Sequence, residues 1–178
     1  VAGVGGGDDT GDRGAAGDTD DFTHPGADAN DDTLQEADAP SPFTIFKSEI
    51  EGFAANLILE AGETIAVAAG MAGGLVIPAG NSITFQTTNT AVAGTITIDS
   101  VISTSGGGTI TIQGSSTGAT VGNIVFGAGG GAVTAGGGAI LIDTNNGSVT
   151  LGGTITASGN MTVNATTGIT DIAGTAIN

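Results

Sequence analysis

The side chains of this 178-residue chain best suited to ion binding or catalysis are carboxylates, and they are concentrated near its N-terminus. Residues 1–51 hold thirteen Asp and Glu, against Arg13 and Lys47. Carboxylate oxygens suit Ca²⁺, although the spacing here does not match an EF-hand loop. Two interpretations stay open. The acids form a solvated tail, or some of them bind calcium, the candidate ligands being Asp8, Asp9, Asp12, Asp18, Asp20 and Asp21. We predict no required cofactor, with calcium as a possible ligand.

Groups for nucleophilic or acid–base catalysis are few. The single histidine is His24, cysteine is absent, and residues 52–178 contain no Lys, Arg or His. A Ser or Thr nucleophile needs a neighbouring base, and that region supplies none. Paired carboxylates drawn from Asp99, Asp143 and Asp171 leave a hydrolase as an alternative. We predict that the protein is not an enzyme.

The net charge of −16 limits the partners of the chain. It repels nucleic acid and anionic membrane surfaces, and two basic residues cannot form a phosphate-binding patch. Residues 64–80 lack charge, but their four glycines and Pro78 do not fit a membrane-spanning helix. We therefore predict no nucleic-acid partner and no membrane insertion.

A sequence motif of three apolar or β-branched residues, called a phrase below, recurs along the chain and indicates short β-strands. Its clearest copies are 57–59, 75–77, 96–98, 110–112, 124–126 and 140–142. Strands this short suit a coil of chain that stacks on itself. The alternation over 95–98 places isoleucine inward and threonine outward. The sequence thus predicts an all-β parallel β-helix, or β-solenoid, with about six coils of roughly twenty residues each over residues 54–178.

Polar residues and glycines recur at fixed places around these phrases. The residues that follow them are Glu60, Pro78, Asp99, Gln113, Gly127 and Asp143. Such residues suit strand corners better than a ladder of carboxylates for cations. Thr-x-Thr units at 95–97, 109–111 and 154–156 would form an ice-binding array only if they lay in register, and the variable phrase spacing favours ordinary outward β positions. Gly and Asn are predicted to supply positive-φ corners between the strands, as at Asn146-Gly147 and Gly159-Asn160.

The first 53 residues divide into two segments. Residues 1–40 form an acidic, Gly/Asp-rich tail or arm that cannot bury enough surface to fold alone, with a weak helical pattern over 33–37. Residues 41–53 form an amphipathic segment framed as a helix by Ser41 and Gly52. Its apolar residues are Phe43, Ile45, Phe46, Ile50 and Phe53. All except Ile45 would share one helix face, whereas Phe43 and Ile45 alternate as in a strand. In either form the segment would cap the first coil.

The run from Gly138 to Ala165 carries a resemblance to a known family. It includes Gly-Gly-Thr-Ile-Thr at 152–156 and Gly-Asn-Met-Thr-Val-Asn-Ala at 159–165. These phrases resemble the GGxITLxA and GxLTVNA repeats of filamentous-haemagglutinin-type exoproteins, and the similarity extends over residues 94–178. The resemblance implies a right-handed parallel β-helix, an extracellular or cell-surface location, and an adhesive or filamentous role. The Asn-Pro motifs of that family's secretion domain have no counterpart here, which leaves the route of export open.

These features favour a structural role. We expect a subunit of an extracellular filament, a head-to-tail homopolymer of stacked solenoids, because an uncapped coil end is a template for another subunit. The N-terminal segment would contribute to subunit contacts. The expected interface residues are Phe43, Ile45, Phe46, Ile50 and Phe53 at one end, and Ile169, Ile172 and Ile177 at the other. The alternative is a monomeric surface adhesin or carbohydrate-binding module, with a host surface or glycan as partner, although sugar faces commonly stack on Trp and Tyr, which are absent.

Overall fold

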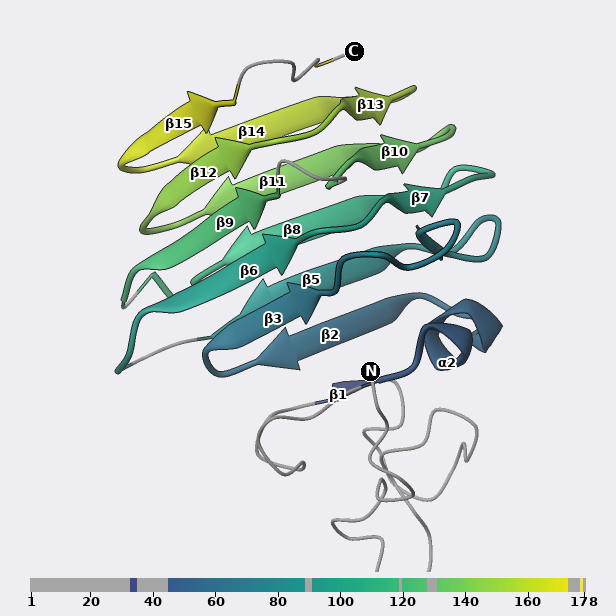
Figure 1. The fold of residues 1–178 in the computed structure, drawn as a ribbon, viewed down its shortest axis with the longest axis horizontal. Helices are drawn as coiled ribbons and strands as arrows, with labels where there is room; N and C mark the ends of the chain where they lie inside the picture. Colours follow the sequence, from purple (N-terminus) through teal and green to yellow (C-terminus); the bar gives the residue numbers. More distant parts are fainter. Residues whose placement is uncertain are drawn as a thin grey trace, which may run out of the picture.

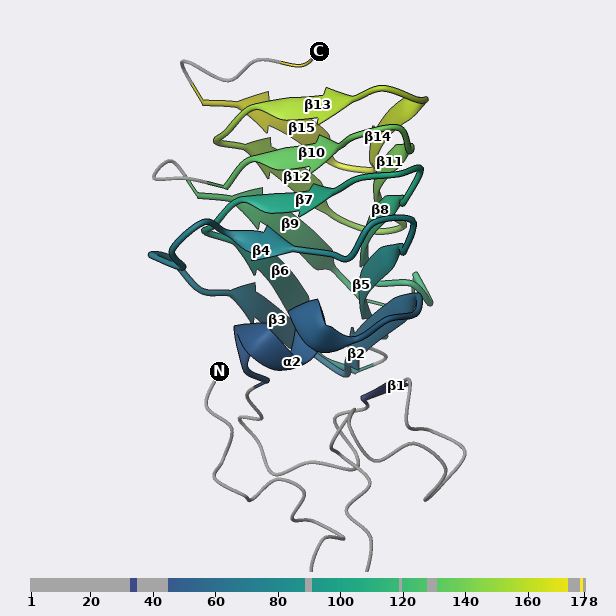
Figure 2. The same ribbon diagram turned by 90° about the vertical axis from the view of Figure 1, so that its right-hand side faces the viewer.

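The computed structural model describes residues 33–34, 45–88, 91–118, 120–127, 131–172 and 177. Over these residues the chain is a parallel β-solenoid with three sheets, as predicted. Figures 1 and 2 show its coils stacked along one axis, with helix α2 (Lys47–Gly52) at the N-terminal end. The six aspartates of the candidate calcium site, and Phe43, lie outside the described residues.

Each coil adds one strand to each sheet in turn. Sheet A contains, in spatial order, β1 (Thr33–Leu34), β2 (Leu57–Ala61), β5 (Ile83–Thr87), β8 (Ile110–Gly114), β11 (Ile140–Thr144) and β14 (Met161–Ala165). Sheet B contains β3 (Thr64–Val67), β6 (Gly94–Ile98), β9 (Gly122–Phe126), β12 (Ser148–Leu151) and β15 (Gly168–Asp171). Sheet C contains β4 (Leu75–Val76), β7 (Ile102–Thr104), β10 (Val133–Ala135) and β13 (Ile155–Ala157). All these pairings are parallel. From β2 onward, the described strands form four complete coils, each with one strand in every sheet, and part of a fifth.

Most coils are longer, and the coils are fewer, than the phrase spacing predicts. Leu57 pairs with Ile83, and Ile110 pairs with Ile140, so both of these coils exceed the predicted length. Coils near the C-terminal end, such as that from Ile140 to Met161, do have the predicted length. The prediction of about six coils is therefore wrong, because the phrases are spread over all three sheets and are joined by corners of unequal length.

The core is built from columns of inward side chains, one from each coil. In sheet A one such column contains Leu59, Phe85, Ile112 and Ile142, all buried. The prediction for 95–98 is confirmed, since Ile96 and Ile98 are fully buried while the threonines beside them are only partly covered. Fully burying such a side chain contributes about 1.5–3 kcal/mol, so repeated columns can stabilise a chain that has few aromatic residues.

Glycine at the corners serves close packing between coils as well as unusual backbone angles. A Cβ on Gly138 would overlap the carbonyl oxygen of Gly108 in the coil below, and a Cβ on Gly159 would lie 2.8 Å from the carbonyl oxygen of Gly138. Positive-φ glycines do occur at corners, as at Gly106 and Gly118, but Gly147 and Gly159 are not among them, so the prediction is wrong for these two. Stacked corners place one backbone directly on the next, which leaves no room for a side chain.

The described part of the chain contains no helix with the length and hydrophobicity needed to cross a lipid bilayer.

Candidate functional site

The N-terminal end of the stack is partly closed by α2. Ile50 is buried in the core, and Ile45 and Phe53 are partly buried and pack against it. The Glu51 carboxylate accepts a hydrogen bond from the backbone N–H of Val76, at 2.7 Å, and one from the Lys47 ammonium, at 2.6 Å. Val76 lies in β4, the terminal strand of sheet C, so Glu51 satisfies an N–H at an open sheet edge.

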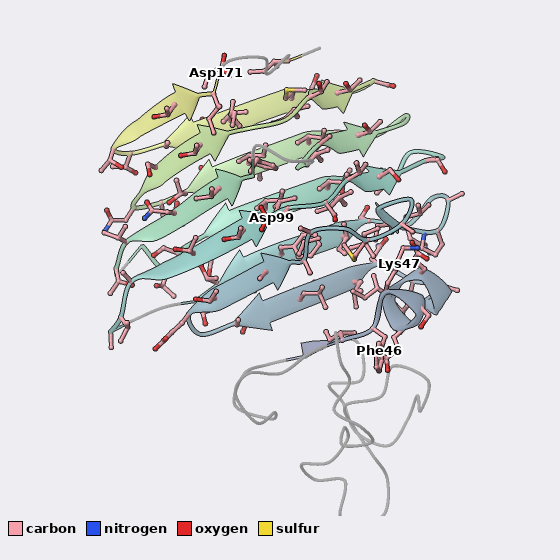
Figure 3. All side chains as sticks on the ribbon, in the orientation of Figure 1. Phe46, Lys47, Asp99 and Asp171 are labelled. Atoms are coloured by element: carbon pink, nitrogen blue, oxygen red, sulfur yellow. The ribbon has the colours of Figure 1, made fainter. Side chains whose placement is uncertain are left out.

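Phe46 does not lie where the helical pattern predicts. The helix begins only at Lys47, and Phe46 precedes it with extended backbone angles, its N–H donating to the Glu49 carboxylate. Its side chain is 48% exposed and points away from the stack in Figure 3. The prediction that Phe46 shares a buried helix face with Ile50 and Phe53 is therefore wrong, because too few residues of the segment are helical. The last helical residue is Gly52, which the sequence pattern places just after the helix.

A short strand extends sheet A beyond the first full coil. Thr33 and Leu34 of β1 pair in parallel with Ile58 and Leu59 of β2, so the helical pattern over 33–37 is not realised at these two residues. The separation of Thr33 from Ile58 along the chain is close to that of Leu57 from Ile83, the partners one coil further on. β1 and α2 therefore occupy two positions of an incomplete coil, called the N-terminal coil below, with β1 in sheet A and α2 beneath sheet C.

The C-terminal end has free strand edges and exposed apolar side chains. β14 and β15 are terminal strands of sheets A and B, each with a described partner on one side. The predicted interface residues Ile169, Ile172 and Ile177 are 51%, 37% and 57% exposed. The coil that contains β14 and β15 has no described strand in sheet C, where its described residues form only an isolated bridge from Ile177 to Ile155. The apolar character that the sequence predicts for this end is present in the structure.

Asp171 gives the same end a feature that sequence reasoning missed. It pairs in register with Leu151, which is buried and belongs to the inward column of sheet B. Below Leu151 that column contains Phe126, Ile98 and Val67. Asp171 is exposed because no described strand covers β15. The signal was available, since Asp171 follows Ile169 by two residues and must therefore face the same side of the strand.

The outer face of sheet A carries a column of acids and amides. Its members, in coil order, are Glu60, Gln86, Gln113, Asp143 and Asn164. The Gln86 amide donates to the Glu60 carboxylate. Three residues expected at separate corners thus share one face, whereas Asp99 follows β6 of sheet B and lies in mid-stack in Figure 3. No cluster of three potential metal ligands occurs among the described residues.

The other polar groups are explained by the fold. The Thr-x-Thr units at 95–97, 109–111 and 154–156 fall on sheets B, A and C, so they do not form one array. Buried hydroxyls at the corners donate to backbone carbonyls. The Ser115 hydroxyl reaches the carbonyl of Thr120 at 2.6 Å, and the Thr144 hydroxyl reaches that of Gly122 at 2.6 Å. These bonds satisfy polar groups where the chain turns.

Comparisons with protein-family models, with curated proteins and with solved structures find no match to this chain. The resemblance of residues 138–165 to filamentous-haemagglutinin-type repeats therefore stays a prediction. What the structure offers for function is the contrast between its two ends and the polar column on sheet A.

Proposed function

We propose that this chain is a structural subunit of an extracellular filament, in which β-solenoids join end to end and the N-terminal segment contributes to the contacts. The observation that supports it most is the C-terminal end, where β14 and β15 each have one edge without a partner among the described residues, beside the exposed side chains of Ile169, Ile172 and Ile177. The extracellular location rests on the resemblance to exoprotein repeats.

The unpaired backbone groups at the edge of a terminal β-strand favour a second copy of the chain as the partner. The outer edge of a terminal strand offers N–H and C=O groups that only another backbone can pair in series. A second copy has the same three-sheet cross-section, so its strands can continue the sheets of the first. Contact between unlike ends that repeats by translation along the stack axis does not close into a ring, and it therefore produces a fibre.

Assembly can be tested by sedimentation velocity and electron microscopy over a concentration series. We expect fibres at high concentration, and loss of fibres when Ile169→Asp places a charge at the C-terminal end. Val92→Asp is the matched control, because Val92 is 53% exposed but lies in the corner between β5 and β6, away from both ends. Monomers at every concentration, or equal effects of the two substitutions, would contradict the proposal.

A monomeric adhesin or carbohydrate-binding module is the second candidate, and the polar column on sheet A favours it. Amide and carboxylate groups repeated once per coil, about 4.8 Å apart, can form hydrogen bonds with the hydroxyls of an extended glycan. Dispersed rods whose binding to immobilised polysaccharide falls on Gln113→Ala, but not on Thr97→Ala on sheet B, would favour this candidate over the filament.

A further inference from the structure

We infer that the N-terminal coil of a second copy is what binds the C-terminal end, with β1 of that copy adding to the free edge of β14. This inference rests on the proposed end-to-end assembly and specifies its junction. In that junction, sheet A runs without interruption from one molecule into the next.

Sheet A supplies the first argument. β1 and β14 are its two terminal strands, and each has a described partner on one side only. All strands of the sheet are parallel, so the two free edges belong to one continuous hydrogen-bonding pattern. A translation of the molecule along the stack brings these edges together with the strand direction unchanged.

The sequences of the strands that β1 would contact supply the second argument. β2, its partner within the chain, reads Leu-Ile-Leu-Glu-Ala, and β14 reads Met-Thr-Val-Asn-Ala. The two strands share inward apolar residues at positions one and three, an acceptor at position four and alanine at position five. A register equal to that on β2 would pair Thr33 with Thr162 and Leu34 with Val163.

The steps at the two ends are complementary, which supplies the third argument. Beyond β13, the described residues add to sheet C a single bridge at Ile177, whereas at the opposite end α2 occupies the position beneath β4. Phe46 projects from that end, away from its own stack, and is available to contact the isoleucines of the next molecule. Helix α2 of one copy would thus lie next to the C-terminal end of sheet C in the other copy, where the described residues contribute only a bridge.

Charge disfavours the alternative in which two C-terminal ends meet. That junction would place two copies of Asp171 together, and residues 52–178 contain no basic side chain to neutralise them. A junction of unlike ends holds one Asp171. Because an uncompensated carboxylate is costly to remove from water, the contribution of Asp171 favours the head-to-tail arrangement over the tail-to-tail one.

Disulfide trapping tests the junction, because the natural sequence has no cysteine. Neighbouring parallel strands lie about 4.8 Å apart, within the Cα separation that a disulfide spans. In the full chain, Thr33→Cys with Thr162→Cys should give a ladder of covalent oligomers under oxidation. Thr162→Cys alone should give no covalent dimer. Thr33→Cys with Ile58→Cys, the control for β1 pairing, should close within one chain.

Two outcomes would overturn the inferred junction while leaving end-to-end assembly intact. One is a covalent dimer from Thr162→Cys alone, which would show that two C-terminal ends meet. The other is fibres that form without the covalent ladder while the control pair still closes. Absence of any concentration-dependent assembly would overturn the proposed function as well as the junction.

Discussion

Replacing Asp171 with leucine should strengthen assembly at the C-terminal end. Asp171 is the last member of an inward column of sheet B whose other residues are apolar and buried. An inward charge on an edge strand is a known device against uncontrolled pairing of sheets. Any subunit that covers β15 must take the Asp171 carboxylate out of water, whereas a leucine side chain at this position would extend the apolar column.

The magnitude follows from the burial of one side chain. Covering a leucine contributes about 1.5–3 kcal/mol, and the cost of desolvating the carboxylate disappears at the same time. Since about 1.4 kcal/mol is a factor of ten in an equilibrium constant, we expect the concentration at half-assembly to fall roughly 10- to 150-fold.

Sedimentation velocity over a concentration series measures this shift, with Thr170→Leu as the matched control. Thr170 lies on the same strand but pairs with Thr150 of the outward column, so its substitution adds apolar surface without extending the core. The reasoning would be refuted if Asp171→Leu assembled no more readily than the natural chain, or if Thr170→Leu gave an equal shift.

Three further predictions concern stability and charge. Ile112→Ala should cost about 2–5 kcal/mol in urea denaturation, because Ile112 is fully buried, while Thr111→Ala on the outer face should change stability by less than about 0.5 kcal/mol. Gly138→Ala should lower stability by about 1–3 kcal/mol because its Cβ would overlap backbone, whereas Gly52→Ala, with open space around it in α2, should be neutral or stabilising, and thermal unfolding compares the two. Raising salt from about 0.01 to about 1 M shortens the Debye length from about 30 to about 3 Å, so light scattering should show more assembly of this chain of net charge −16.

The coil architecture could be predicted from sequence because strand alternation is a local property. Ile96 and Ile98 face inward and Thr97 outward whatever the rest of the chain does. The assignment of each phrase to a sheet depends instead on corner length, which varies widely. The coil from Ile102 to Val133 is much longer than the coil from Val149 to Ile169, and no local pattern marks which phrases are neighbours.

The details of the N-terminal end were beyond sequence reasoning for a different reason. The hydrogen bond from Val76 to the Glu51 carboxylate joins two residues that are distant in the sequence, and neither residue type indicates the other. Phe46 has the spacing of a helical partner for Ile50, but that spacing has meaning only where the chain is helical, and α2 begins one residue later. Such contacts depend on where the cap is placed against the stack.

The two inward columns of sheet B end differently, and this difference bears on how the C-terminal end can act. One column runs through Ile96, Ile124 and Val149 to Ile169, and remains apolar to the last described strand of the sheet. The neighbouring column ends in Asp171. A surface with both columns apolar would accept any open β-edge, including that of an unfolded chain. With one carboxylate beside the exposed isoleucine, only a partner that gains enough contact elsewhere in the junction can compensate for covering the charge. In the proposed assembly, Asp171 would therefore make association at this end depend on the fit of the whole coil, as expected of a specific assembly contact.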